Sequence, residues 1–384
     1  MHIAFLTSEY PHPKVAHAAG IATSIKNLAI ALTKKNVTVT VFVYQQNENT
    51  IIKDQGVTIH LIKRKNYKFL TWYFYRKHIQ NYINTIVKTE NIDLLEAADW
   101  TGITAFMRLK LPLVIRLHGS DAYFCKLDNR KQKFKNFVFE KSALLKAKGY
   151  IAPTTFAGEE TAKIFGLKRT KIKTIHNGIE TSVFQNDSPE TYNKNTVLYI
   201  GTLIRKKGVL ELAQIFNKVV LEQSEAQLVL IGSDSKDIKT GATSTYQLMQ
   251  DLLSDAAKLQ TQYLGKIPYA EVQEQIKKAQ VCVFPSFAET QGMVTIESMS
   301  LQKPVVNTSI GWAKELIDDG INGYLVHPTD IDVYAAKIVA LLKDKTLCLQ
   351  LGKQARKKVE TTFDIDGIAD LNKAYYLSII NQNA

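Results

Sequence analysis

Short apolar runs alternate with amphipathic stretches along the first half of the chain. The run at 2–7 is followed by a segment at 20–35 whose apolar residues recur at helical spacing, and then by a β-rich run at 37–44. This succession predicts strand, helix, strand, the βαβ unit of a parallel sheet. Further apolar runs, GVTIHLI, IDLLEAA, LPLVIRLHG, GYIAPT and IKTIHNG, continue the alternation.

The second half repeats the pattern after a polar stretch at 185–196, which is typical of a linker. Its runs VLYI and LVLI are apolar at every position, as expected of parallel strands buried on both faces. We therefore predict an α/β protein of two tandem Rossmann-like, doubly wound domains, at 1–186 and 187–364. A terminal helix at 365–384 is expected to pack across both. Ligands bind at the carboxyl ends of strands in such sheets, so the cleft between the domains is the expected site.

Composition agrees with a globular protein of this size. The 384 residues are 45% hydrophobic and 22% charged, and no run of 18 apolar residues or signal peptide is recognised, so we expect a cytoplasmic protein. The three cysteines, Cys125, Cys282 and Cys348, have no metal or redox spacing and are expected to be reduced thiols.

The net charge of +13 is confined to one half. Residues 1–190 hold 28 Lys and Arg against 15 Asp and Glu, whereas 191–384 balance to zero. The stretch 63–78 mixes basic and aromatic side chains, and 126–148 is a second basic amphipathic segment. Such residues suit an anionic membrane surface. A core helix with lysines extending to solvent, or a lysine-rich composition without functional meaning, explains them equally well, and nucleic acid is not the expected partner.

The stretch at 285–299, PSFAETQGMVTIESM, carries two carboxylates around one glycine. Eight helical residues turn by about 800°, so Glu289 and Glu297 would not share a helix face. We place Glu289 on a loop and Glu297 in the second turn of the helix that follows Gly292. The first N–H groups of that helix would then suit a phosphate. An acid/base pair of the kind used by glycoside hydrolases is the alternative.

These residues resemble the signature of glycosyltransferase family 4, retaining enzymes of the GT-B fold. The likeness extends over most of the chain through RLHGSD at 116–121, HNGIE at 176–180, GTLIRKKG at 201–208, LVLIGSD at 228–234, YLGKIP at 263–268 and GINGYLVHPTD at 320–330. One departure is Ser298, where the family usually has Ala. Another is Thr202, where it usually has Arg.

The resemblance implies roles for particular residues. Glu289 would contact the hydroxyls of the donor sugar, Glu297 the ribose, and His118 the reacting sugar. Lys207, with Arg205 replacing the missing arginine, would neutralise the leaving diphosphate. The remaining donor-binding residues implied by the likeness are Gly20, Gly201, Thr202, Gly232, Ile267, Thr290, Gln291, Gly292, Met293 and Val294.

The resemblance also implies an activity. We expect a hexosyltransferase that moves a sugar from a UDP- or GDP-sugar to a glycan or lipid-linked acceptor in cell-envelope polysaccharide synthesis, peripherally on the inner face of the membrane. No cofactor is expected, and no metal, since there is no Asp-x-Asp pair at a strand end. A non-catalytic anion- or membrane-binding protein and a GT-B sugar-nucleotide epimerase or hydrolase are the alternatives.

Overall fold

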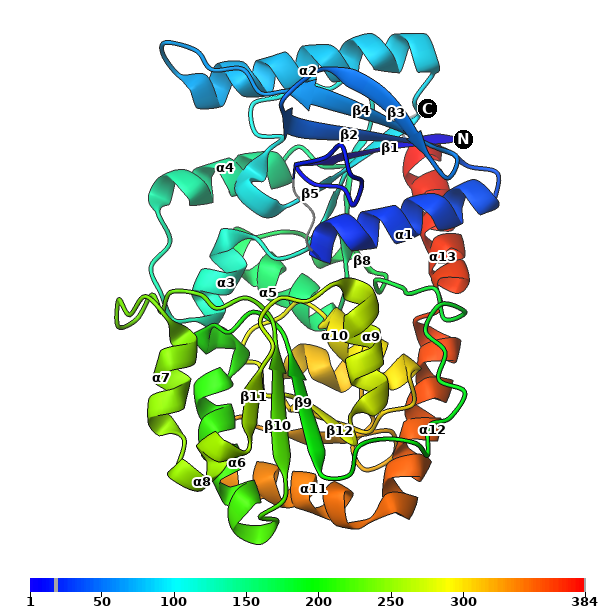
Figure 1. Ribbon diagram of the computed structural model, residues 1–384. Coiled ribbons are helices and arrows are strands. Elements are labelled where there is room, and N and C mark those ends of the chain that lie inside the picture. Colours follow the sequence, from blue (N-terminus) through cyan, green and yellow to red (C-terminus); the bar gives the residue numbers. More distant parts are fainter. Residues whose placement is uncertain (17–19, 383–384) are drawn as a thin grey trace. The chain divides into compact units, whose positions relative to one another are not determined.

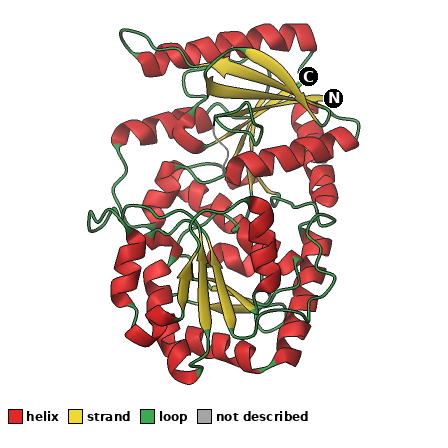
Figure 2. Ribbon diagram, in the orientation of Figure 1, coloured by secondary structure: helices red, strands yellow, loops and turns green. Residues whose placement is uncertain are grey.

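The chain folds into two compact units in a computed structural model that describes residues 1–16 and 20–382. Unit 1 contains Met1–Glu180 and Asp364–Ala384, and unit 2 contains Thr181–Phe363. Each unit is a doubly wound α/β domain, which confirms the predicted fold class (Figure 2). The chain passes from unit 1 to unit 2 between Glu180 and Thr181, a few residues before the predicted boundary at 186. The terminal helix belongs to unit 1.

Unit 1 is built on an eight-stranded sheet in the order β3-β4-β2-β1-β5-β6-β7-β8. All neighbouring strands are parallel except β3, which pairs antiparallel with β4 at the edge and was not predicted from the sequence. The strands are β1 (His2–Thr7), β2 (Thr38–Gln46), β3 (Thr50–Asp54), β4 (Val57–Lys63), β5 (Leu94–Ala98), β6 (Leu113–Arg116), β7 (Gly149–Ala152) and β8 (Ile172–Thr174).

Helices cover both faces of this sheet because side chains along each strand alternate between its faces. In β1, Ile3 and Phe5 pack in one core cluster, and Ala4 and Leu6 pack in the other. The helices of unit 1 are α1 (Gly20–Lys34), α2 (Thr71–Glu90), α3 (Asp121–Leu127), α4 (Phe134–Leu144), α5 (Thr155–Phe165) and α13 (Ile365–Asn381), with short 3-10 turns η1 (Trp100–Gly102) and η2 (Arg169–Lys171).

A buried ionic network attaches the terminal helix α13 to the sheet of unit 1. Arg116 in β6 donates from Nε and Nη2 to Glu96 in β5 at 2.7 and 3.0 Å, and from Nη2 to Asn372 in α13. Tyr376 in α13 donates to Glu96 at 2.6 Å. Removing one partner would leave a buried charge uncompensated. The network therefore ties the end of the chain to unit 1, where α13 also lies beside α1 (Figure 1).

Unit 2 has a six-stranded, all-parallel sheet in the order β11-β10-β9-β12-β13-β14, with helices on both faces (Figure 2). Its strands are β9 (Thr196–Ile200), β10 (Gln227–Ile231), β11 (Thr261–Tyr263), β12 (Val281–Phe284), β13 (Val305–Thr308) and β14 (Tyr324–Val326). Its helices are α6 (Val209–Glu222), α7 (Thr245–Leu252), α8 (Asp255–Leu259), α9 (Tyr269–Lys278), α10 (Met293–Ser300), α11 (Ile331–Lys343) and α12 (Lys345–Thr362), with 3-10 turns η3 (Arg205–Lys207) and η4 (Gly311–Glu315).

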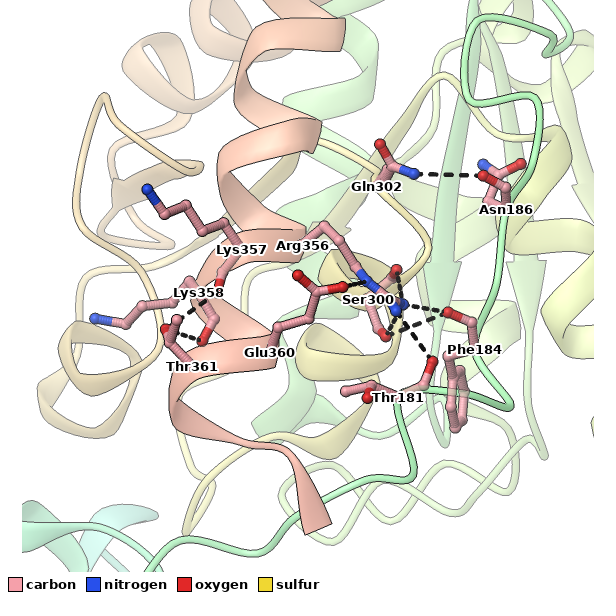
Figure 3. Close-up of polar contacts among 10 residues, drawn as sticks. All are labelled: Thr181, Phe184, Asn186, Ser300, Gln302, Arg356, Lys357, Lys358, Glu360 and Thr361. Atoms are coloured by element: carbon pink, nitrogen blue, oxygen red, sulfur yellow. Dashed lines mark hydrogen bonds and ion pairs between the residues drawn. The ribbon is translucent and has the colours of Figure 1, made fainter. Parts of the chain in front are cut away.

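Arg356 in α12 holds the first residues of unit 2 in place (Figure 3). Its guanidinium donates to the backbone carbonyls of Thr181, Phe184 and Ser300, and to the Glu360 carboxylate at 2.6 Å. Those carbonyls belong to the segment that enters unit 2 and to the last residue of α10. The five donors of a guanidinium allow one side chain to satisfy several acceptors. Arg356 thereby joins the entering segment, α10 and α12.

Replacing Arg356 with Met should destabilise unit 2. The substitution keeps much of the side-chain volume but leaves three backbone carbonyls without their donor, so we expect a loss of about 3 kcal/mol in the free energy of unfolding. Thermal unfolding followed by circular dichroism measures it. Lys357→Met is the control, because that neighbouring lysine is exposed on the same helix. Equal unfolding temperatures for Arg356→Met and wild type would contradict this role.

Candidate active site

The candidate site of unit 2 lies where the strand order of its sheet reverses. The strands that follow β9 along the chain, β10 and β11, lie on one side of it, and β12, β13 and β14 lie on the other. The loops after β9 and β12 therefore leave the same edge of the sheet next to each other. This topological switch point is where ligands bind in open α/β sheets. The two loops are GTLIRKKG at 201–208 and the start of PSFAETQGMVTIESM at 285–299.

Backbone contacts join these two loops. The Phe287 N–H donates to the Lys206 carbonyl at 2.8 Å. Gly208, at φ +72°, approaches the Pro285 carbonyl so closely that a Cβ there would lie 1.8 Å from the oxygen. Only a residue without a side chain fits this contact. The loops are thus fixed relative to each other before any side chain is considered.

This contact brings Lys207 and Glu289 together. The Lys207 ammonium forms an ion pair with the Glu289 carboxylate, and both side chains are about one-fifth exposed. Burial, with the charge of Lys206, lowers the pKa of Lys207 to about 7, whereas the Glu289 carboxylate favours the charged ammonium. The two residues also line a small pocket with Gly292 and Val294. The structure therefore assembles these predicted residues at one place.

Gly292 is the N-cap residue of helix α10. It adopts the left-handed conformation at φ 88°, and Met293 is the first helical residue, as predicted. The Thr295 N–H donates back to the Gly292 carbonyl at 3.1 Å, while the N–H groups of Met293 and Val294 have no acceptor within the helix. The positive end of the helix lies beside the Lys207–Glu289 pair, which makes this pocket suited to an anion.

Glu297 lies in the second turn of α10 and is 7% exposed. The Tyr269 hydroxyl at the start of α9 donates to its Oε1 at 2.6 Å. Burial raises the pKa of Glu297 to about 7, although the Tyr269 hydrogen bond acts in the opposite direction. The sequence did not indicate Tyr269, the first residue of α9. Its partner on α10 could be found only from the fold.

Arg205 occupies a different environment from Lys207. Its Nε and Nη2 donate to the two oxygens of Asp237 at 2.9 and 2.8 Å. Arg205 lowers the pKa of Asp237 below its usual range. Asp237 was also missed from the sequence. It neutralises much of the positive charge of Arg205, which the sequence had assigned to the diphosphate. Arg205 also does not line the pocket that contains Lys207.

Other predicted donor residues lie along the same sheet edge. Gly201 and Gly232 follow β9 and β10, and a Cβ on Gly232 would lie 2.0 Å from the Gly201 carbonyl oxygen. Thr202 is exposed, Ile267 is half-buried, Thr290 is half-buried and Gln291 is buried. The glycines therefore allow close packing of strand ends.

His118 lies in unit 1, just past the end of β6. Burial lowers the pKa of His118 to about 3, and the positive charge of Arg116 contributes in the same direction. The imidazole is therefore neutral near pH 7, and it can exchange hydrogen bonds with hydroxyl groups but cannot contribute a positive charge.

Two buried carboxyl groups surround the turn that follows His118. Glu140 in α4 accepts from the N–H groups of Asp121 and Ala122 at 2.8 and 3.2 Å. Asp99, after β5, faces the N–H groups of His118 and Gly119, although neither of its oxygens reaches hydrogen-bond geometry within the described residues. Burial, together with Glu140, raises the pKa of Asp99 to about 8. Neither acid was predicted from the sequence, although Asp99 comes directly after the apolar strand β5.

Gly20 begins helix α1 of unit 1, as the sequence predicts, with open space where a Cβ would be. The Glu9 carboxylate accepts from the Ala22 N–H in the first turn at 3.1 Å. Part of this helix terminus is therefore occupied by a side chain of the protein itself. The described ranges contain no group of three His, Cys, Asp or Glu side chains arranged to hold a metal ion.

Glu297→Gln should change how stability depends on pH. The carboxyl titrates at about 4.3 when unfolded and at about 7 when folded, so the folded state binds the proton more tightly. The Glu297 carboxyl should make wild type lose stability as pH rises from about 4 to about 7, and the glutamine variant should lack this part of the loss. At pH 8 we expect the variant to be more stable than wild type by about 3–4 kcal/mol. Unfolding across pH, with Glu271→Gln on the exposed side of α9 as control, measures this. A pH-independent difference would contradict it.

Two family models match consecutive parts of the chain. The model described as Glycosyltransferase Family 4 matches residues 18–183, and the model described as Glycosyl transferases group 1 matches residues 180–358. An uncharacterized glycosyltransferase of Methanocaldococcus jannaschii is 25% identical over 391 residues, which cover 96% of each chain. The capsular polysaccharide biosynthesis glycosyltransferase CapM of Staphylococcus aureus is 28% identical, over 65% of this chain and 67% of its own.

Solved structures share the fold. Sucrose-phosphate synthase from Thermosynechococcus elongatus superposes with a TM-score of 0.80 at 18% identity over 99% of each chain. Anabaena HepE in complex with UDP has a TM-score of 0.73 at 18% identity, over 98% of this chain and 100% of its own. With both halves of the chain matched by these family models, the protein belongs to the group 1/family 4 glycosyltransferases of the GT-B fold, which transfer sugars from nucleotide sugars.

Proposed function

We propose that the protein is a retaining hexosyltransferase whose unit 2 binds a UDP- or GDP-sugar and whose unit 1 binds a glycan or lipid-linked acceptor. The observation that carries the donor site is the Lys207–Glu289 pair beside the N-terminus of α10, with Glu297 one turn further along. In this assignment Glu289 binds sugar hydroxyls, the helix terminus and Lys207 bind the diphosphate, and Glu297 binds the ribose hydroxyls.

The three groups suit the three parts of such a donor. A carboxylate accepts hydrogen bonds from neighbouring hydroxyls, which fits both a sugar and a ribose. An ammonium and a helix N-terminus both attract the negative charge of a diphosphate. Lys207 contacts the Glu289 carboxylate and Tyr269 contacts that of Glu297, so donor binding would exchange these internal contacts for hydroxyl groups.

The proposed chemistry retains the configuration of the sugar. The bond between the anomeric carbon and the phosphate oxygen breaks, the acceptor oxygen bonds to that carbon on the same face, and the acceptor proton passes to the leaving phosphate. Negative charge grows on the diphosphate during this step, so Lys207 would stabilise the transition state more than the bound donor. Neutral His118 would hydrogen-bond the reacting sugar, and no metal is required.

Relatives support the choice of substrates without fixing them. UDP is bound in the structure of Anabaena HepE, which supports a UDP-sugar. CapM is named for capsular polysaccharide biosynthesis, which supports a cell-envelope glycan as acceptor. The proposed location is the inner face of the cell membrane.

A panel of UDP-, GDP- and ADP-sugars should contain a ligand that raises the unfolding temperature. At a concentration one hundred times the dissociation constant, binding adds about 2.7 kcal/mol of stability. Glu297→Ala should reduce this shift because the ribose loses its acceptor, and Glu271→Ala should not. Mass spectrometry with lipid extracts should then detect a glycosylated product. Release of free sugar or an epimerised donor as the only product would overturn the transferase assignment.

Lys207→Ala should lower kcat by roughly 10²–10³-fold with a smaller rise in KM, because the ammonium acts mainly on the leaving group. Lys206→Ala is the matched control, since its backbone carbonyl, which anchors Phe287, is unchanged. Steady-state rates with the donor from the panel provide the measurement. Similar losses in both variants would assign the effect to net charge and reject Lys207 as the leaving-group cation.

A further inference from the structure

One surface of unit 1 exposes large apolar side chains that its core does not use. Phe69 and Leu70, in the loop before α2, are 79% and 56% exposed, and Phe134, the first residue of α4, is 80% exposed. Phe74 and Val138 follow Leu70 and Phe134 by four residues on their helices and are also exposed. We call these five residues and the lysines around them the basic–apolar face.

Aromatic contacts join the α2 and α4 parts of this face, which Figure 1 labels in unit 1. The Trp72 ring lies 4.9 Å from the Phe139 ring, and Lys135 of α4 lies over both rings at 5.6 and 5.5 Å. Tyr73 links Trp72 to Phe74 through ring contacts of 5.9 and 5.5 Å. A chain of aromatic contacts therefore runs from Phe74 in α2 to Phe139 in α4.

The inward side of α2 accounts for only part of its apolar residues. Tyr75, Ile79 and Ile83 pack in the core of unit 1, and Arg76 donates to the carbonyls of Trp72, Thr101 and Gly102. A core helix therefore explains these residues but not Phe69, Leu70 and Phe74. Leu70 even occupies the left-handed region at φ 47°, which is uncommon for leucine.

The charge of this face is strongly positive. The two segments that carry the exposed apolar residues also expose nine cations: Lys63, Arg64, Lys65, Lys68, Lys126, Lys131, Lys133, Lys135 and Lys141. Residues 63–78 contain no carboxylate at all. Of the two acids in 126–141, Glu140 is buried and Asp128 lies 3.8 Å from Arg130. The nine cations are therefore not neutralised by acids within these two segments.

We infer that the basic–apolar face docks on a membrane surface that carries anionic phospholipids. Lysines beside exposed phenylalanine and leucine match lipid headgroups above an acyl region. No helix among residues 1–16 and 20–382 is long and apolar enough to cross a bilayer. A membrane-bound protein could reach a lipid-linked acceptor, so this inference extends the proposed function. Only the biological purpose of the membrane contact rests on that proposal.

Sedimentation with vesicles tests this inference without any enzymatic readout. The full chain should bind phosphatidylcholine vesicles containing 30% phosphatidylglycerol at least tenfold more tightly than phosphatidylcholine alone, since each cation near an anionic surface adds about fivefold. The combined variant Lys65→Glu, Lys68→Glu, Lys131→Glu and Lys133→Glu should lose this preference. The control carries Lys236→Glu, Lys239→Glu, Lys343→Glu and Lys353→Glu, four exposed lysines of unit 2, and should bind as wild type.

A second variant separates apolar insertion from simple charge attraction. Phe69→Ser, Leu70→Ser and Phe134→Ser should weaken binding to anionic vesicles several-fold in 0.5 M NaCl, where electrostatic attraction is screened. Equal binding to neutral and anionic vesicles, equal loss in the unit 2 control, or tighter binding to single-stranded RNA than to vesicles would overturn the inference. Vesicle binding without sugar transfer would instead reject the proposed function but support the inference that this surface binds membranes.

Discussion

The contact between Gly208 and the Pro285 carbonyl is the constraint on which the candidate donor site depends. It lets the loops after β9 and β12 touch at the switch point of the sheet, and the Phe287 to Lys206 hydrogen bond fixes them there. Lys207 and Glu289 form their ion pair because the two loops that carry them are in contact. A side chain at position 208 would force the loops apart, so the spacing of cation, carboxylate and helix terminus is a property of the backbone.

Buried ionisable groups gather around both sets of candidate residues. Burial raises the pKa values of Glu297 and Asp99 and lowers that of His118, and it also lowers that of Lys207. Each such shift reduces the stability of the folded protein at some pH, which a purely structural role would not require. Perturbed groups of this kind are concentrated at functional sites. In unit 2, Lys207 and Glu297 lie close to the N-terminus of α10, where a ligand that carries both phosphate and hydroxyl groups could contact all three.

Much of the fold could be predicted from the sequence because strands buried on both faces are apolar throughout, as VLYI and LVLI are. The start of α10 after Gly292 was equally readable. The order of the strands in each sheet could not be predicted, because the sequence does not indicate which strands are neighbours. For that reason the partners Tyr269 and Asp237, which come from distant segments, were missed, and Arg205 was assigned to the diphosphate without its carboxylate partner. The edge strand β3, with polar residues interspersed, also escaped prediction.

We propose that Glu289, the N-terminus of α10 and Glu297 bind the sugar, the diphosphate and the ribose of one nucleotide-sugar donor. A crystal structure of the protein with a non-reactive analogue of its donor tests this directly. We expect sugar hydroxyls at Glu289 and phosphate oxygens at the N–H groups of Met293 and Val294, with Lys207 alongside. Ribose hydroxyls should lie at Glu297 in place of Tyr269. A donor bound in the opposite direction, or at another edge of the sheet, would contradict it.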